Sequence, residues 1–191
     1  MIKMKITGYH GTLEDPAKII NSDGTMKRKA FNKKQIPGDL GYGTYFFKNN
    51  PNLAYDFTEK FIQKSENSIN VIECHLEVNE NEVIDFNDAQ NLEHFIASRE
   101  RLLQSVKHNF KNLQGNRNCI DGIVIEFILQ YTQNKKDLIK LVVKDTYTPT
   151  NKYSISNGSR KSFFLSNYFN GTELCVRDES IVIEGAVYNG L

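Results

Sequence analysis

The sequence predicts an α+β fold with a mostly antiparallel sheet. Segments with strand patterns lie at both ends of the chain, and segments with helical patterns lie early and in the middle. This segregation is typical of α+β proteins, whereas α/β proteins alternate the two kinds of element. The chain has 191 residues, a length that suits one domain, and we expect that domain to span residues 1–191.

The first half of the chain opens with a strand pattern and contains two helical segments. Asp15 is a suitable N-cap for the first helix, with Pro16 at its first position. In the second helix, Leu53, Phe57 and Phe61 recur at four-residue spacing, which predicts an apolar stripe. The expected elements are a strand over 4–9, a short helix from 16 to about 22, a polar and locally basic loop over 25–40, a strand over 41–47, a helix over 51–64, and strands over 69–78 and 82–86.

The second half contains one long helical pattern followed mainly by strand patterns. Residues 88–111 carry apolar side chains at helical spacing. Residues 120–131 form a short apolar run that fits either a helix or a strand, because periodicity alone does not separate the two. Strands are expected over 138–144 and within 163–188, with a turn-rich segment over 147–158 between them.

Composition and charge exclude several classes of protein. The 24 Lys and Arg residues nearly cancel the 23 Asp and Glu residues, so any nucleic-acid contact must depend on local patches such as 27–34 or 160–161. Cys74, Cys119 and Cys175 are odd in number and widely spaced, which is typical of reduced thiols and not of a disulfide framework or a zinc site. Because we find neither a signal peptide nor an apolar membrane span, we expect a soluble, cytoplasmic protein without a membrane or metal partner.

Three short segments carry the chemically informative residues. Each has a structural alternative: a histidine beside glycine is often a turn residue, a Gly-x-Gly-x-Tyr-Phe run is often a closely packed strand, and a carboxylate at a strand start is often solvated. Together, a histidine, open glycine backbone, aromatic faces and a carboxylate suit a flat cationic ring that bears a carboxamide. The segments are Tyr9-His10-Gly11-Thr12, Leu40-Gly41-Tyr42-Gly43-Thr44-Tyr45-Phe46 and Thr172-Glu173-Leu174-Cys175-Val176-Arg177-Asp178-Glu179-Ser180.

In this order, the three segments resemble the His-Tyr-Glu signature of the ADP-ribosyltransferase superfamily, in the branch of diphtheria-toxin-like and poly(ADP-ribose)-polymerase-like catalytic domains. Residues 9–12 match its Tyr-His-Gly-Thr/Ser, and residues 40–46 match its Leu-Gly-x-Gly-x-Tyr-Phe. Glu173, followed by Asp178 and Ser180, is similar to its Glu-Tyr-x-x-Tyr-Asp-x-Ser strand. The resemblance implies an ADP-ribosyltransferase-like fold, with a split antiparallel sheet and flanking helices, and NAD as a substrate.

The resemblance also implies roles for individual residues. His10 would hydrogen-bond the ribose next to nicotinamide, the backbone of Gly11 would pair with the carboxamide, and Tyr45 would stack on one face of the ring. Thr12 completes the first motif and is expected at the same NAD site. Glu173 would be the catalytic carboxylate, holding a ribose hydroxyl and stabilising an oxocarbenium-like transition state as nicotinamide leaves.

Two of these assignments have competitors. Phe57 is the expected second stacking aromatic, but it also belongs to the apolar stripe, so Tyr55 stays an alternative. Glu179 and Glu184 lie near Glu173 in the sequence, but neither occupies the matching strand position.

Two positions depart from the family pattern. Gly171 stands where the arginine-modifying branch has Glu or Gln, which disfavours arginine as the acceptor. Ala54 stands where a serine often precedes the second aromatic, so one carboxamide hydrogen bond is expected to be missing or supplied elsewhere. The loop over 154–171 is expected to face the acceptor. Its basic and aromatic side chains would either contact nucleic acid or belong to core strands: Arg160, Lys161, Phe163, Phe164, Tyr168 and Phe169.

The expected function is that of a mono-ADP-ribosyltransferase, which cleaves NAD, releases nicotinamide and transfers ADP-ribose to a protein or nucleic-acid acceptor. By analogy of fold, such a domain suits a toxin of a toxin–antitoxin or phage-defence system, with an antitoxin or inhibitor protein as a partner, or a phage-encoded modifier. NAD hydrolysis and non-catalytic binding of NAD or ADP-ribose are the alternatives. The joint presence of His10, Tyr45 and Glu173 argues against the second alternative.

Overall fold

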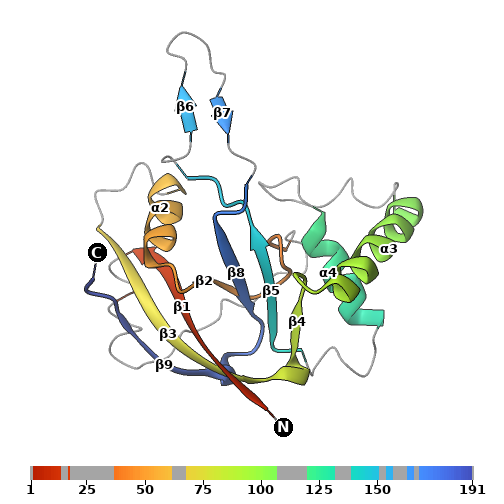
Figure 1. Ribbon diagram of the computed structural model, residues 1–191, viewed down its shortest axis with the longest axis horizontal. Coiled ribbons are helices and arrows are strands. Elements are labelled where there is room, and N and C mark those ends of the chain that lie inside the picture. The colour runs from red at the N-terminus through yellow and green to blue at the C-terminus, as the bar shows by residue number, and fades with distance from the viewer. Residues whose placement is uncertain are drawn as a thin grey trace.

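The computed structural model describes residues 2–13, 17, 37–61, 68–106, 120–131, 139–150, 154–156, 163–165 and 168–190. It confirms the α+β class, with a seven-stranded sheet and three α-helices in these residues (Figure 1). Several predicted features lie outside the described residues: the short helix after Asp15 apart from Ala17, the loop over 25–36, Cys119 and the basic pair at 160–161.

The strands form one mixed sheet and one separate hairpin. The strands are β1 (Lys3–Leu13), β2 (Thr44–Lys48), β3 (Ile69–Asn79), β4 (Val83–Asp85), β5 (Leu141–Thr146), β6 (Ser154–Ser156), β7 (Phe163–Leu165), β8 (Gly171–Val176) and β9 (Val182–Val187). The sheet order is β4-β5-β8-β2-β1-β3-β9, and β6 pairs with β7 in a hairpin that projects from the sheet (Figure 1). The sheet is mixed because β4 and β5 run parallel, whereas the other neighbouring strands run antiparallel.

Among neighbouring strands of the described sheet, β1 and β2 share the fewest residue pairs. Only two residue pairs, Gly8 with Lys48 and Tyr9 with Phe47, join these strands. By contrast, β1 pairs with β3 along its whole length. The two strands therefore separate beyond Tyr9, within a sheet that is otherwise continuous, and this separation positions the site described below.

Three helices cover parts of the sheet. Helix α2 (Pro51–Phe61) packs over β1 and β3, while α3 (Ala89–Val106) and α4 (Asp121–Tyr131) pack on each other near the β4–β5 end (Figure 1). The ambiguous run over 120–131 is therefore a helix. Short 3₁₀ turns η1 (Glu80–Glu82) and η4 (Glu179–Ile181) precede β4 and β9.

Alternating side chains build a core on both faces of the sheet. Phe47 packs with Leu53 of α2 in one cluster, whereas its neighbour Phe46 belongs to the cluster on the opposite face. A third cluster joins α3 and α4 to the sheet through Phe95, Ile125 and Val142 among others. The site thus lies next to well-packed elements, which limits the freedom of its side chains.

The strand expected over 138–144 is β5 at Leu141–Thr146, and β6 lies in the segment expected to be turn-rich. Two further strand boundaries, both next to the site, also differ from the prediction. Strand β1 continues to Leu13, so the first motif lies within the strand and not after it. Strand β2 begins only at Thr44, because the glycine-rich segment before it forms a turn in which the Gly41 amide donates to the Gly38 carbonyl at 3.0 Å. Gly41 has a φ of +95°, a conformation that side-chain-bearing residues rarely adopt.

The described residues also bear on the expected partners. None of their helices has both the length and the apolar character that crossing a membrane requires. Within the same residues, no group of three or more potential ligands could hold a metal ion.

Cys74 and Cys175 are buried, and burial, with the charge of Glu73, raises the pKa of the Cys74 thiol to about 12. The Cys74 thiol therefore stays protonated and unreactive at neutral pH.

Candidate active site

A cavity of about 260 Å³ opens where β1 and β2 separate. It brings together His10 and Gly11 from β1, Tyr45 from β2, Phe57 from α2 and Glu173 from β8. The two that lie farthest apart in the sequence, His10 and Glu173, are 163 positions apart. The remaining lining residues are Gly38, Phe47 and Thr58.

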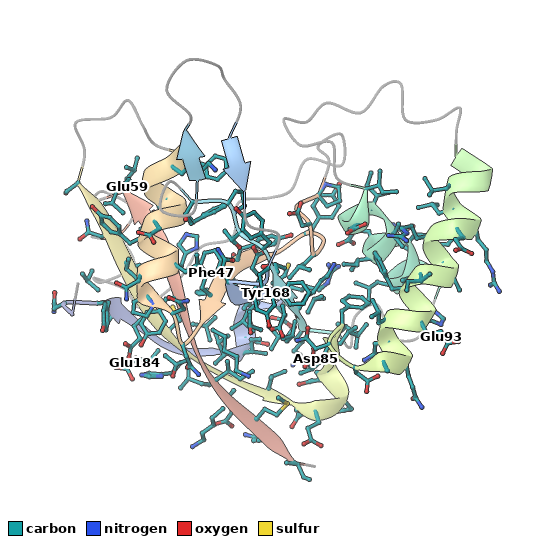
Figure 2. All side chains as sticks on the ribbon, turned by 45° about the horizontal axis from the view of Figure 1, so that its top comes forward. Phe47, Glu59, Asp85, Glu93, Tyr168 and Glu184 are labelled. Carbon is teal, nitrogen blue, oxygen red and sulfur yellow. The ribbon has the colours of Figure 1, made fainter. Side chains whose placement is uncertain are left out.

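The other predicted residues lie elsewhere. Thr12 and Tyr55 are not among the residues that line the cavity, and Tyr55 packs against the cluster that contains Leu53. Glu184 lies on β9 at the outer edge of the molecule, away from Phe47 of the cavity wall (Figure 2). Glu179 belongs to η4 and also does not line the cavity. Of the three carboxylates considered from the sequence, only Glu173 is at this site.

His10 fills the gap that opens between the strands. Its Nδ1 lies 2.7 Å from the Tyr45 carbonyl oxygen, at the level where β1 and β2 no longer pair. A carbonyl can only accept, so Nδ1 carries the proton and donates it. Burial lowers the pKa of His10, against the opposing effect of this hydrogen bond. The imidazole is therefore neutral at pH 7, and its Nε2 is a hydrogen-bond acceptor.

Gly11 lets helix α2 approach β1 closely. A Cβ at this position would collide with the Ala54 carbonyl oxygen and with the Thr58 hydroxyl. Thr58 is buried, and its hydroxyl donates to the Ala54 carbonyl at 2.8 Å, so it is held one turn along the helix from Ala54. The sequence offers no hydroxyl at Ala54, but the structure places that of Thr58 beside Gly11.

Substituting Gly11 by alanine is expected to destabilise the protein by about 1–3 kcal/mol, the usual cost of overpacking. The added methyl group must displace the backbone of α2 at Ala54, which a side-chain rotation cannot relieve. Urea denaturation measures the loss. Gly190→Ala is a suitable control, because its methyl group would meet only the movable end of the Tyr188 side chain. Equal denaturation midpoints for Gly11→Ala and the wild type would contradict this close packing.

Tyr45 is anchored by two hydrogen bonds at its hydroxyl. Its hydroxyl donates to the Gly41 carbonyl at 2.8 Å and accepts from the Leu40 amide at 2.9 Å. Burial raises the pKa of the phenol, which therefore stays protonated. The Gly41 turn thus fixes the ring against the cavity, where Gly38 lies close to the hydroxyl.

Two phenylalanines form an aromatic wall. The rings of Phe47 and Phe57 have centroids 5.7 Å apart and meet edge to face, and Phe57 also contacts Phe61 at 4.7 Å. Phe57 therefore both belongs to the apolar stripe and lines the cavity. Phe47 pairs directly with Glu173 across β2 and β8, which places the carboxylate next to this wall.

Glu173 is a buried carboxylate with a defined hydrogen-bond partner. Its side chain is 9 % exposed, and Oε1 accepts a hydrogen bond of 2.7 Å from the Thr148 hydroxyl. A carboxylate buried against aromatic rings would be costly without such a partner. The cavity thus combines one charged group with several apolar surfaces, an arrangement that is typical of small-molecule sites.

A buried ion pair supports the turn that carries Tyr45. Arg177, just after β8, makes a two-pronged contact with Glu126 of α4, and its Nη2 lies 3.1 Å from Oε2. Both partners also hold the backbone of Tyr42, whose amide donates to Glu126 at 2.7 Å and whose carbonyl accepts from Arg177 at 3.2 Å. Helix α4 and β8 are therefore connected through the loop that precedes Tyr45.

Sequence reasoning missed four residues of the site or its support. Phe47 directly follows the second motif and Gly38 lies two residues before it, so extending that motif in both directions would have found them. Thr58 directly follows Phe57, one helical turn from Ala54. Thr148 lies in a turn-rich segment, where nothing in the sequence distinguishes it from its neighbours.

The segment expected to face an acceptor is only partly described. Tyr168 and Phe169 are 82 % and 62 % exposed, so they are not core residues, and their ring centroids lie 6.4 Å apart.

Comparisons with protein-family models, curated proteins and solved structures found no match for this chain. The function is therefore inferred from the residues and geometry of the cavity.

Proposed function

We propose that this chain is a mono-ADP-ribosyltransferase that cleaves NAD and transfers ADP-ribose to a macromolecular acceptor. The observation that carries the proposal is the meeting of His10, Tyr45 and Glu173, from three separate segments, at one cavity. These are the residues for which the sequence resemblance implies binding and catalysis. Chance would not ordinarily bring all three to the same 260 Å³.

The proposed nicotinamide site uses the rings of Tyr45 and Phe57 and the backbone of β1. The rings of Tyr45 and Phe57, both on the cavity, are suited to the faces of a cationic pyridinium ring. The backbone of Gly11 pairs with the carboxamide. The Thr58 hydroxyl beside it donates its proton to the Ala54 carbonyl, so it accepts a hydrogen bond from the carboxamide NH₂ group. Typical ligand pockets measure about 300–1,000 Å³, so this smaller cavity suits the nicotinamide end and leaves the adenosine end outside it.

In the proposed reaction, the bond between the nicotinamide nitrogen and ribose C1′ breaks, and nicotinamide leaves with the bonding electron pair. Positive charge develops on the ribose, where the Glu173 carboxylate stabilises it. His10 accepts a hydrogen bond from a ribose hydroxyl through Nε2, its available acceptor. The nucleophilic atom of the acceptor then bonds to C1′ and releases its proton to solvent.

The packing of Gly171 favours acceptors other than arginine. In the arginine-modifying branch, this position, two residues before the catalytic glutamate, carries Glu or Gln. Here a Cβ at Gly171 would collide with the end of the buried Leu53 side chain of α2, so a longer side chain fits only if Leu53 moves. We therefore propose a protein side chain other than arginine, or a nucleic acid, as the acceptor.

Incubation of the protein with labelled NAD, with and without cell extract, tests the proposal. Nicotinamide release that requires the extract, with label on a macromolecule, would support transfer, and nuclease or protease treatment would then identify the acceptor class. Equal release without extract would indicate NAD hydrolysis instead. NAD binding without any release would leave a non-catalytic binding module, and the absence of both would contradict the proposed site.

A further inference from the structure

Thr148 is bonded to the proposed catalytic carboxylate although it lies 25 positions from it in the sequence. Its side chain is 1 % exposed, and its hydroxyl donates to Oε1 of Glu173 at 2.7 Å. Glu173 pairs with Lys144 of β5 across the sheet, so the chain that leaves β5 passes beside the carboxylate. One oxygen of Glu173 is thereby held on the protein side.

The side chain of Asn170 holds Thr148 in this position by bonding the backbone amide and carbonyl of Thr148. The Thr148 amide donates to Oδ1 of Asn170 at 2.8 Å, and the Thr148 carbonyl accepts from Nδ2 at 2.7 Å. The Asn170 amide in turn donates to the Thr146 carbonyl at 3.1 Å. Thr148 belongs to no helix or strand. The Asn170 side chain therefore satisfies the backbone groups of Thr148, as the neighbouring strands satisfy those of Glu173.

The threonine hydroxyls form a chain with one direction. Oγ1 of Thr146 lies 3.3 Å from Oγ1 of Thr148, and either could donate. A threonine hydroxyl has a single proton, and an ionised carboxylate can only accept. Because Thr148 gives its proton to Glu173, Thr146 must be the donor to Thr148. The chain therefore presents a hydrogen to the carboxylate and stabilises its ionised form.

We propose that Thr148, held by Asn170, is a positioning residue that fixes the orientation and ionised state of Glu173. This inference rests on the proposed function, in which Glu173 must face the developing positive charge. Thr148 touches the carboxylate at the oxygen that the protein holds, and it acts on the reaction only through Glu173. It should therefore affect the chemical step and not the binding of NAD.

The test compares Thr148→Val, which removes the hydroxyl at nearly constant volume, with Thr148→Ser, which keeps it. A hydrogen bond to a charged group contributes enough that its loss is expected to lower kcat about 10- to 100-fold in the valine variant. We expect KM for NAD to stay within a few-fold of the wild type, and the serine variant to recover most of kcat. A general loss of folding would not produce this split or this rescue.

Thr172→Val is the matched control. Thr172 precedes Glu173 on the same strand, but its hydroxyl bonds Asp145 at 2.6 Å on the other face of the sheet. It therefore loses a similar hydrogen bond without touching the carboxylate, and its kcat should equal that of the wild type. Thr148→Val with wild-type kcat would overturn the inference, as would an equal loss in Thr172→Val.

Crystal structures of the same variants separate this inference from the proposed function. If the wild type releases no nicotinamide, the proposed function fails. The Glu173 rotamer in these structures then decides by itself whether Thr148 positions the carboxylate. A different Glu173 rotamer in Thr148→Val, with the original rotamer in Thr148→Ser, would support positioning, and an unchanged rotamer in both would overturn it. If Thr148→Val does not fold, Asn170→Ser takes its place in the comparison of Glu173 rotamers. It removes the Asn170 side-chain bonds that hold the Thr148 backbone but keeps the Thr148 hydroxyl.

Discussion

Replacing Glu173 by glutamine is expected to lower kcat for nicotinamide release about 10²- to 10³-fold, equivalent to about 3–4 kcal/mol of transition-state stabilisation. Glutamine keeps the size of the side chain and can still accept the hydrogen bond from Thr148, but it lacks the negative charge that stabilises the ribose in the proposed reaction. NAD binding should remain close to the wild type, because the aromatic wall and Gly11 are unchanged. Release is measured by chromatography of nicotinamide, and binding by calorimetry.

Glu184→Gln provides the matched control for this prediction. It makes the same chemical change on β9, at a position that does not line the cavity. The control should release nicotinamide at the wild-type rate. If Glu173→Gln also turns over NAD normally, Glu173 is not the catalytic carboxylate.

Arg177→Met is expected to reduce the free energy of unfolding by about 3–5 kcal/mol, because it leaves the buried charge of Glu126 without its partner. The side chains of Arg177 and Glu126 are only 10 % and 11 % exposed, so solvent cannot replace the lost contact. The substitution also removes a donor to the Tyr42 carbonyl, and with it part of the support for the turn below Tyr45. Urea denaturation followed by circular dichroism measures the effect.

Two further variants show whether this loss comes from the unpaired charge. Lys140 is 25 % exposed, and Glu82 keeps two hydrogen bonds from Asn79 when Lys140 is replaced, so Lys140→Met should cost only about 0–1 kcal/mol. The double variant Arg177→Met with Glu126→Leu should be more stable than Arg177→Met alone, because neither charge remains buried. A loss below that of Lys140→Met in the single variant would contradict the assignment of a buried, energetically coupled pair.

The motif residues could be identified from the sequence because their chemistry is local. A histidine and glycine at the end of a strand pattern, a glycine-rich turn before Tyr45, and a carboxylate at the start of a strand each depend on nearby residues. The helix over 51–64 could also be predicted from the spacing of Leu53, Phe57 and Phe61, and the structure has α2 at Pro51–Phe61.

Other features depend on contacts that no local pattern records. The run over 120–131 is apolar nearly all round, so it has no helical or strand periodicity, and it becomes a helix where it packs between the sheet and α3. Phe57, the middle residue of the apolar stripe, also lines the cavity, which its spacing in the sequence does not show. Thr148 depended on the register between β5 and β8, which sets its distance from Glu173.

The sequence by itself determined the α+β class, the motif residues that meet at the cavity, and the near-neutral charge that confines any nucleic-acid contact to local patches. The tertiary structure alone decided that β1 and β2 separate beyond Tyr9, that His10 fills the gap, and that Thr58 and Thr148 stand beside Gly11 and Glu173. The physical reason is that propensity and periodicity act over a few residues. A cavity, in contrast, is formed by strand register and helix packing between segments that lie far apart in the chain.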